Sequence, residues 1–186
     1  MISCSTETTL FTWKSPEAKF DSLKNILVMG LIKDIEYRDA YEKGITTSLE
    51  LNGIKCTPAL SVLSPAKKYT DEELQQIITN KGFNGIIFLK YQGTKVDKTT
   101  SSGKTYTKYY KRFVNSSSSK RYIEEHKTVF MEISLFDASS GEVIWMGSAK
   151  TIDVDSPQEL AESLSQELIK GLRKDGVIQT QLKIKK

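Results

Sequence analysis

The longest uninterrupted apolar segment of the chain, residues 26–32, is seven residues long. A helix that crosses a bilayer needs about 20 apolar residues, so this segment is too short to span a membrane. Its length and continuous apolarity are typical of a strand buried on both faces of a sheet. Apolar residues spaced three and four apart follow from Tyr37 to Leu49 and end at Asn52-Gly53, which indicates a helix with a glycine stop. The chain therefore predicts buried strands with helices packed against them.

The alternation of strand and helix patterns continues along the chain. Thr70 and Glu73 form a capping box, and Ser156-Pro157 is an N-cap followed by proline at the first helical position. The expected strands cover residues 25–32, 55–63, 85–91, 127–136 and 142–151. These patterns predict an α/β (α+β) fold with a single mixed sheet of about five strands. The element order is β-α-β-α-β-(long hairpin arm)-β-β-α, with the helices packed on the sheet.

The length of 186 residues suits one domain. The expected parts are a polar, irregular N-terminal tether over residues 1–22, one α/β domain over residues 23–178, and a basic C-terminal tail over residues 179–186. Pro58 places its strand at a sheet edge or a bulge, because proline donates no backbone hydrogen bond. Arg38 and Glu42 lie four residues apart and are expected to pair on the exposed side of the first helix.

Apolar periodicity also predicts the core. Leu164 and Leu168 fall on the apolar stripe of the last helix, and Ile87 falls in a central strand. Hydrophobic residues make up 38% of the chain and charged residues 27%, close to globular averages. These values exclude a wholly disordered chain and a collagen-like chain.

The positive charge of the chain is concentrated in one segment. The whole chain carries +4, whereas residues 93–124 hold eight basic and two acidic residues, a net +6, which leaves −2 for the rest. The alkaline pI of about 8.9 is therefore a local property and does not by itself indicate nucleic-acid binding. Residues 94–122 show no apolar periodicity and separate two strands, so they predict a long hairpin arm that extends beyond the sheet.

The arm combines cations with aromatic side chains and has three interpretations. It is a solvated hairpin whose lysines protect an edge, a contact element for a protein or an envelope polymer, or a binder of single-stranded nucleic acid. The candidate contact residues are Lys104, Tyr106, Lys108, Tyr109, Tyr110, Lys111, Arg112 and Phe113. Nothing in the arm matches a ribonucleoprotein motif, so nucleic acid is the least favoured partner. A steep salt dependence of oligonucleotide affinity would support it.

Motifs for catalysis and metal binding are scarce. His126 is the sole histidine and stands in a charged run typical of a solvated side chain. Ser101-Ser102-Gly103-Lys104-Thr105 resembles the end of a phosphate-binding loop, but Lys98 occupies the position that needs glycine. Cys4, Cys56 and His126 are too few and too scattered for a structural zinc site. We expect no enzymatic activity, no metal and no cofactor. An enzyme with an unrecognised carboxylate site remains the alternative, and a deep pocket with converging acids would favour it.

The N-terminal residues predict a membrane anchor. Ile2-Ser3-Cys4 followed by Ser5-Thr6 matches the end of a bacterial lipobox with its polar tether. Acyl chains on one cysteine hold a soluble domain at a membrane without a spanning helix. We therefore expect lipid on Cys4 and no disulfide between Cys4 and Cys56. The Cys56 side chain is expected to pack as a small apolar group in its strand.

Residues 25–178 resemble a group of Gram-negative envelope lipoproteins. The group includes the activators of penicillin-binding proteins, curli-secretion-type lipoproteins, the amino-terminal domain of the Tol-system propeller protein and Bacteroidetes lipoproteins. The resemblance rests on the order of strands and helices and on the hairpin sequence ISLFDASSGEVIW. It implies a non-enzymatic module that binds an envelope protein or polymer, anchored at the outer membrane on its periplasmic side or at the cell surface. The arm has no counterpart in the group, so the resemblance does not identify the partner.

Overall fold

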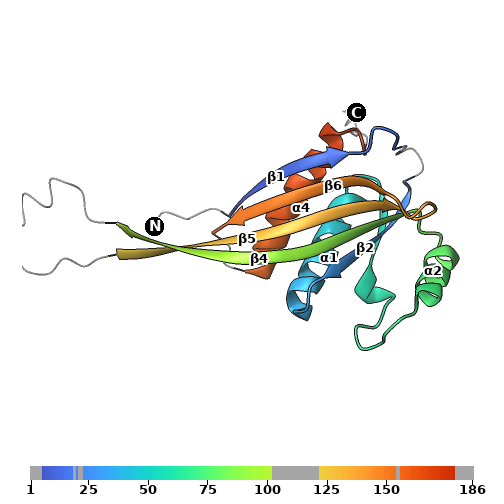
Figure 1. Ribbon diagram of the computed structural model, residues 1–186, viewed down its shortest axis with the longest axis horizontal. Coiled ribbons are helices and arrows are strands. Elements are labelled where there is room, and N and C mark those ends of the chain that lie inside the picture. The colour runs from blue at the N-terminus through green and yellow to red at the C-terminus, as the bar shows by residue number, and fades with distance from the viewer. Residues whose placement is uncertain (1–5, 19, 21–22, 102–121, 154–155, 179–186) are drawn as a thin grey trace, which may run out of the picture.

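The computed structural model describes residues 6–18, 20, 23–101, 122–153 and 156–178. Within these residues the chain forms one mixed sheet of six strands, in the order β1-β6-β5-β4-β2-β3. The strands are β1 (Glu7–Lys14), β2 (Asn25–Leu31), β3 (Lys55–Pro58), β4 (Gly85–Ser101), β5 (Tyr122–Asp137) and β6 (Val143–Ile152). The helices are α1 (Ile35–Glu50), α2 (Asp71–Asn80) and α4 (Pro157–Lys174), with a short 3-10 helix η1 (Ala59–Ser61). In Figure 1, α1 and α4 lie behind the sheet and α2 lies at its lower right.

The topology confirms the predicted α/β fold. β2 pairs in parallel with both β3 and β4, whereas β4, β5, β6 and β1 pair antiparallel in succession. The predicted caps are present: the Thr70 hydroxyl accepts from the backbone of Glu73, and the Ser156 hydroxyl accepts from that of Glu159. Pro58 ends β3, which is an edge strand as expected. β3 is shorter than the predicted residues 55–63 because η1 follows the proline directly.

The sixth strand, β1, corrects the prediction that residues 1–22 are irregular. β1 pairs with β6 over its whole length, from Glu7 opposite Ile152 to Lys14 opposite Trp145. The Thr8 hydroxyl lies 2.8 Å from the hydroxyl of Thr151 and 2.7 Å from that of Ser163 in α4. The strand escaped detection because threonines occupy much of its inward face, so its hydrophobic alternation is weak.

β4 and β5 are much longer than predicted. Their pairing continues to Ser101 opposite Tyr122, whereas the pairing of β5 with β6 ends at Thr128. Beyond this point the two strands form a ribbon that projects from the sheet, drawn at the left of Figure 1. The first and last residues of the predicted arm are therefore strand. The arm contact residues Lys104–Phe113 lie outside the described residues.

The main core lies between the sheet and the layer formed by α1 and α4. Ile87, Leu164 and Leu168 are each no more than 1% exposed, which confirms their predicted burial. The two helices approach closely where Gly44 faces Ala161. A Cβ added to Gly44 would lie only 3.3 Å from the Ala161 Cβ. A second, smaller core lies under α2.

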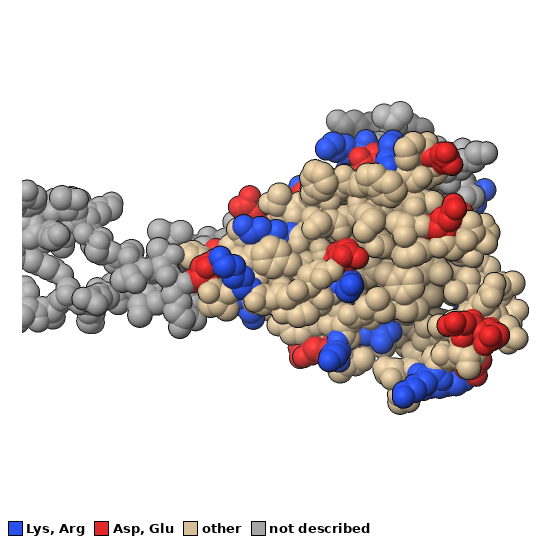
Figure 2. Space-filling view, viewed as in Figure 1, with Lys and Arg blue, Asp and Glu red and all other residues tan. Residues whose placement is uncertain are grey.

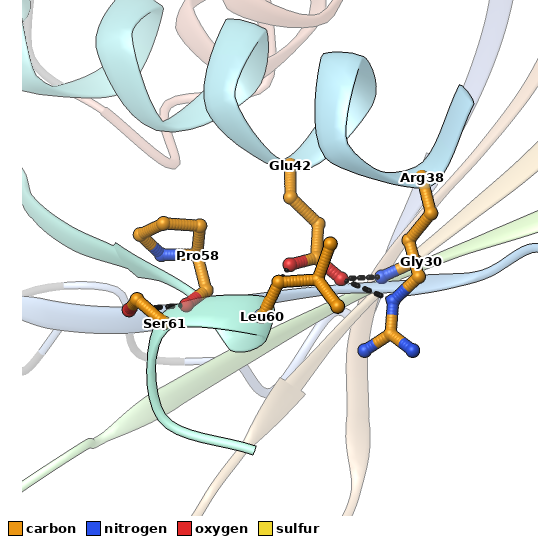
Figure 3. A network of polar contacts seen from close by, with 6 residues as sticks. All are labelled: Gly30, Arg38, Glu42, Pro58, Leu60 and Ser61. Atoms are coloured by element: carbon orange, nitrogen blue, oxygen red, sulfur yellow. Dashed lines mark hydrogen bonds and ion pairs between the residues drawn. The ribbon is translucent and has the colours of Figure 1, made fainter. Parts of the chain in front are cut away.

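Glu42 corrects the prediction of an exposed ion pair on α1. Its carboxylate is fully buried, and Oε1 accepts from Arg38 Nε at 2.8 Å and from the Gly30 backbone nitrogen at 2.8 Å. Oε2 accepts from the Leu60 backbone nitrogen at 2.7 Å. Figure 3 shows the side chain reaching from α1 to β2 and η1. The pair exists as predicted, but it lies inside and joins three elements.

On the opposite face of the sheet, no described segment covers β1, β6 and β5. Phe11 and Trp13 on β1 are 78% and 49% exposed, and Phe130 on β5 is also exposed. Figure 2 shows this face as mostly uncharged, with scattered acidic and basic residues.

Candidate functional site

The predicted site residues fall into two groups. Cys4 and the arm residues Lys104, Tyr106, Lys108, Tyr109, Tyr110, Lys111, Arg112 and Phe113 lie outside the described residues. Cys56 is described and carries a free, buried thiol, as expected for a small apolar group. Burial, together with the nearby Glu50 carboxylate, raises the pKa of Cys56 to about 12, so the thiol is unreactive at neutral pH.

His126 is paired, in contrast to the solvated side chain that its charged run suggested. Its Nδ1 lies 2.9 Å from Oδ1 of Asp153, a residue with a positive φ of 56° just after β6. The Asp153 carbonyl also accepts from the Thr6 hydroxyl at 3.0 Å. These contacts tie the start of the described chain to β5 and to the end of β6.

A pocket of about 580 Å³ lies at the N-terminal end of α1, where the β4–β5 ribbon leaves the sheet. It is built by the end of β2, the first turns of α1, the middle of β4, the middle of β5 and the start of α4. The lining residues are Leu31, Ile32, Lys33, Asp34, Tyr37, Tyr41, Tyr91, Thr94, Lys127, Val129 and Leu160. Its volume lies in the range of roughly 300–1,000 Å³ that is usual for small-molecule sites.

Helix periodicity and a bulge in β4 place the tyrosines of the pocket. Tyr37 and Tyr41 lie four residues apart on α1 and therefore share one face. In β4 the register shifts between Tyr91 and Gly93, so that Tyr91 opposes Met131 and Thr94 opposes Val129. The extra residue brings Tyr91 and Thr94, three apart, to the same face, and their hydroxyl oxygens lie 2.7 Å apart. Gly93 has φ +136°, a conformation that side chains with a Cβ rarely adopt.

Tyr41 is the most unusual group of the pocket. Its side chain is 1% exposed, yet its hydroxyl has no hydrogen-bond partner among the described residues. Burial raises the pKa of Tyr41 well above its usual range, and the Tyr37 and Tyr91 phenols add to the effect. The hydroxyl therefore stays protonated and remains a donor. The sequence pattern does not reveal this site, because a tyrosine on the apolar stripe of a helix looks like a core residue.

The charges of the pocket are mainly positive. Lys33 and Lys127 are exposed, and neither forms an ion pair among the described residues. The carboxylate of Asp34 caps α1, where its Oδ1 accepts from the backbone nitrogens of Glu36 at 3.0 Å and Tyr37 at 3.2 Å. These groups suit the binding of a partly apolar ligand with hydrogen-bond acceptors.

No cluster of three or more His, Cys, Asp or Glu side chains suited to a metal ion occurs in the described parts of the chain. None of the helices in those parts is long and apolar enough to cross a membrane.

Comparisons with known proteins show a shared fold. No protein-family model matches the sequence, and no curated protein matches it significantly. The structure is similar to that of a PelC dodecamer from Paraburkholderia phytofirmans, with a TM-score of 0.52 and 14% identity over 89% of this chain and 96% of that one. Lipoprotein GNA1162 from Neisseria meningitidis has a TM-score of 0.44 and 13% identity over 81% and 99% of the two chains. A minor lipoprotein from Acinetobacter baumannii has a TM-score of 0.38 and 11% identity over 83% and 95%.

Proposed function

We propose that this protein is a non-enzymatic binding module of the bacterial cell envelope, held at a membrane by lipid on Cys4. The anchor is supported by the lipobox-like Ile2-Ser3-Cys4 and by the resemblance of the sequence to envelope lipoproteins. In this proposal the domain lies at the outer membrane, on its periplasmic side or at the cell surface.

The observation that carries the binding role is the pocket at the N-terminal end of α1, where the buried Tyr41 hydroxyl has no partner in the described parts of the chain. A buried donor without a partner costs free energy, and a ligand that brings an acceptor recovers it. The described lining has no histidine or cysteine, and its carboxylate, Asp34, is occupied by the helix cap. These side chains suit recognition better than acid–base catalysis. The basic aromatic arm would add a protein-contact element that begins at the mouth of the pocket.

The anchor is tested by labelling the bacterium that produces this protein with an alkyne-tagged fatty acid. We expect the label on the wild-type protein and on Cys56→Ser, which serves as the matched control. Cys4→Ser should lose the label and leave the membrane fraction. An unlabelled wild-type protein, or a labelled Cys4→Ser variant, would contradict the anchor.

The binding role is tested by photo-crosslinking in intact envelopes. A photoreactive amino acid replaces Thr94, which lines the pocket, or Lys150, which is exposed on β6. We expect a discrete crosslinked product from position 94 and none of the same mass from position 150. Identical products from both positions, or none from position 94, would contradict a binding role for the pocket.

A further inference from the structure

We propose that the pocket binds a single-chain anionic amphiphile, in which an acyl chain is joined through an ester to a phosphate-bearing head group. This assignment rests on the proposed function and names the ligand class of its site. It follows from the distribution of apolar walls, buried donor and exposed cations around one cavity.

The walls of the pocket select an apolar body. Leu31, Ile32, Val129 and Leu160 are aliphatic, and the three tyrosines contribute aromatic surface. The volume of about 580 Å³ admits a chain rather than a single small ion. Burial of the chain against these side chains provides the main favourable free energy of binding.

The Tyr41 hydroxyl selects an acceptor within that body. It is buried, protonated and without a partner among the described residues. An ester carbonyl offers an acceptor and brings no donor of its own. The hydrogen bond to Tyr41 would fix how far the chain enters the pocket.

The rim selects negative charge. Two cations line the pocket, Lys33 at the β2–α1 turn and Lys127 on β5. The Asp34 carboxylate, which also lines it, already accepts hydrogen bonds from the first turn of α1. A phosphate between two ammonium groups gains charge-assisted hydrogen bonds.

The pocket offers more hydrogen-bond donors than free acceptors, which argues against a peptide as the occupant. Each peptide residue brings an N–H group that needs an acceptor. The Asp34 carboxylate already accepts two backbone bonds, and the Tyr91 and Thr94 hydroxyls bond to each other. An acyl ester and a phosphate offer acceptors and bring no backbone N–H groups, which matches the side chains present.

The position of the pocket relative to the proposed anchor fits a lipid ligand. The Thr6 hydroxyl lies 3.4 Å from the Glu159 carboxylate. Leu160, which follows Glu159 in α4, lines the pocket. Cys4 precedes Thr6 by two residues, a reach of at most about 7 Å. Lipid on Cys4 would therefore hold the pocket near a membrane surface.

Isothermal titration calorimetry tests the proposal. The protein used is the full chain carrying Cys4→Ser, which cannot be lipid-modified at residue 4. The probes are lauroyl-lysophosphatidylglycerol, lauroyl-lysophosphatidylcholine and inorganic phosphate, each kept below its micellar concentration where it has one. We expect saturable binding of the lysophosphatidylglycerol, at least about tenfold weaker binding of the zwitterionic lipid, and no binding of phosphate alone.

Variants locate the binding. Lys33→Glu and Lys127→Glu should each weaken the lysophosphatidylglycerol about tenfold. Lys150→Glu changes the net charge equally on the opposite face and should change affinity less than about twofold. Tyr41→Phe keeps the ring and should weaken both lysolipids roughly fivefold. Circular dichroism confirms that each variant is folded.

The proposal is overturned if the anionic lipid does not bind, or if both lysolipids bind equally. It is also overturned if Lys150→Glu weakens binding as much as the pocket variants do. A crosslink from position 94 without lysolipid binding would overturn the ligand class and leave the proposed binding function standing.

Discussion

The Glu42 carboxylate lies 2.8 Å from the backbone nitrogen of Gly30, which joins α1 to β2 inside the protein. Arg38 approaches the same oxygen from one turn earlier in the helix, and the other oxygen accepts from Leu60. The side chain thereby fixes α1 against the end of β2. Because the chain from Leu31 to Asp34 lines the pocket, this contact also sets the geometry of the proposed site.

Removal of the Glu42 carboxylate should be strongly destabilising. Glu42→Ala leaves two backbone N–H groups and the Arg38 guanidinium without their acceptor, at a cost of about 3–5 kcal/mol. The matched control is Asp39→Ala, which breaks the exposed Asp39–Lys43 pair on the same helix. That change should cost no more than about 1 kcal/mol. Urea unfolding measures both values, and equal losses would show that the buried network contributes no more than a surface pair.

Truncation of core side chains should separate the core from the arm. Leu164→Ala, Leu168→Ala and Ile87→Ala should each lower the free energy of unfolding by about 2–5 kcal/mol, because all three are buried. Lys104→Ala and Lys108→Ala in the arm should change it by no more than about 0.5 kcal/mol. Chemical denaturation measures these free energies, with one common slope of unfolding free energy against denaturant concentration for all variants. Similar losses at both kinds of position would mean that the arm packs against the core.

The Cys56 thiol should resist modification in the native protein. Burial, together with the Glu50 carboxylate, raises its pKa to about 12, so almost no thiolate exists near pH 8. In a Cys4→Ser background, Ellman's reagent should react slowly with the folded protein and rapidly after unfolding in urea. Rapid reaction under native conditions would indicate that β3 opens easily at its edge.

The hairpin between β5 and β6 should make stability depend on acid pH. Hydrogen bonds from the Ser139 hydroxyl and from the backbone of Ser140 and Ser139 lower the pKa of Asp137 below its usual value. The stabilisation is therefore complete above the unfolded pKa of about 3.9 and is lost as pH falls through the lower folded pKa.

Ser139→Ala removes the strongest of these donors. Its Tm should lie below that of the wild type near pH 7, and the difference should be smaller at about pH 2. Thermal unfolding at both pH values measures the difference, and an NMR titration should show a higher Asp137 pKa in the variant. A Tm difference that persists unchanged at low pH would contradict the assignment.

Deletion of residues 98–121, with the ribbon closed by a short turn, should leave the domain folded. β6 stops pairing with β5 at Thr128 and β2 stops pairing with β4 at Lys90, so the deletion begins beyond the part of the sheet that forms the core. The melting temperature should stay within a few degrees of the wild type, while recovery of a partner from envelope extract should be lost. Reversal of charge at Lys108, Lys111 and Arg112 should slow association more than it speeds release. A deletion variant that retains its partner would make the arm a solvated hairpin.

Residues close together in the sequence determined the helices and most of the strands. Thr70 and Ser156 begin helices through hydrogen bonds to residues three positions away, and Gly176 ends a helix with a positive φ of 74°. Continuous apolar runs in the sequence indicate the buried strands. For these elements local sequence is sufficient because the stabilising contacts are themselves local.

The tertiary structure alone decided β1, the burial of Glu42 and the pocket. β1 depends on pairing with β6, more than 130 residues away in the chain, and its threonines carry little hydrophobic signal. Glu42 is buried because distant backbone N–H groups of β2 and η1 need an acceptor. The pocket joins side chains from β2, α1, β4, β5 and α4. A single extra residue in β4 near Gly93 makes the Thr94 side chain point toward the pocket. Sheet register and burial arise only when distant segments meet, and the same holds for the burial of the Tyr41 hydroxyl.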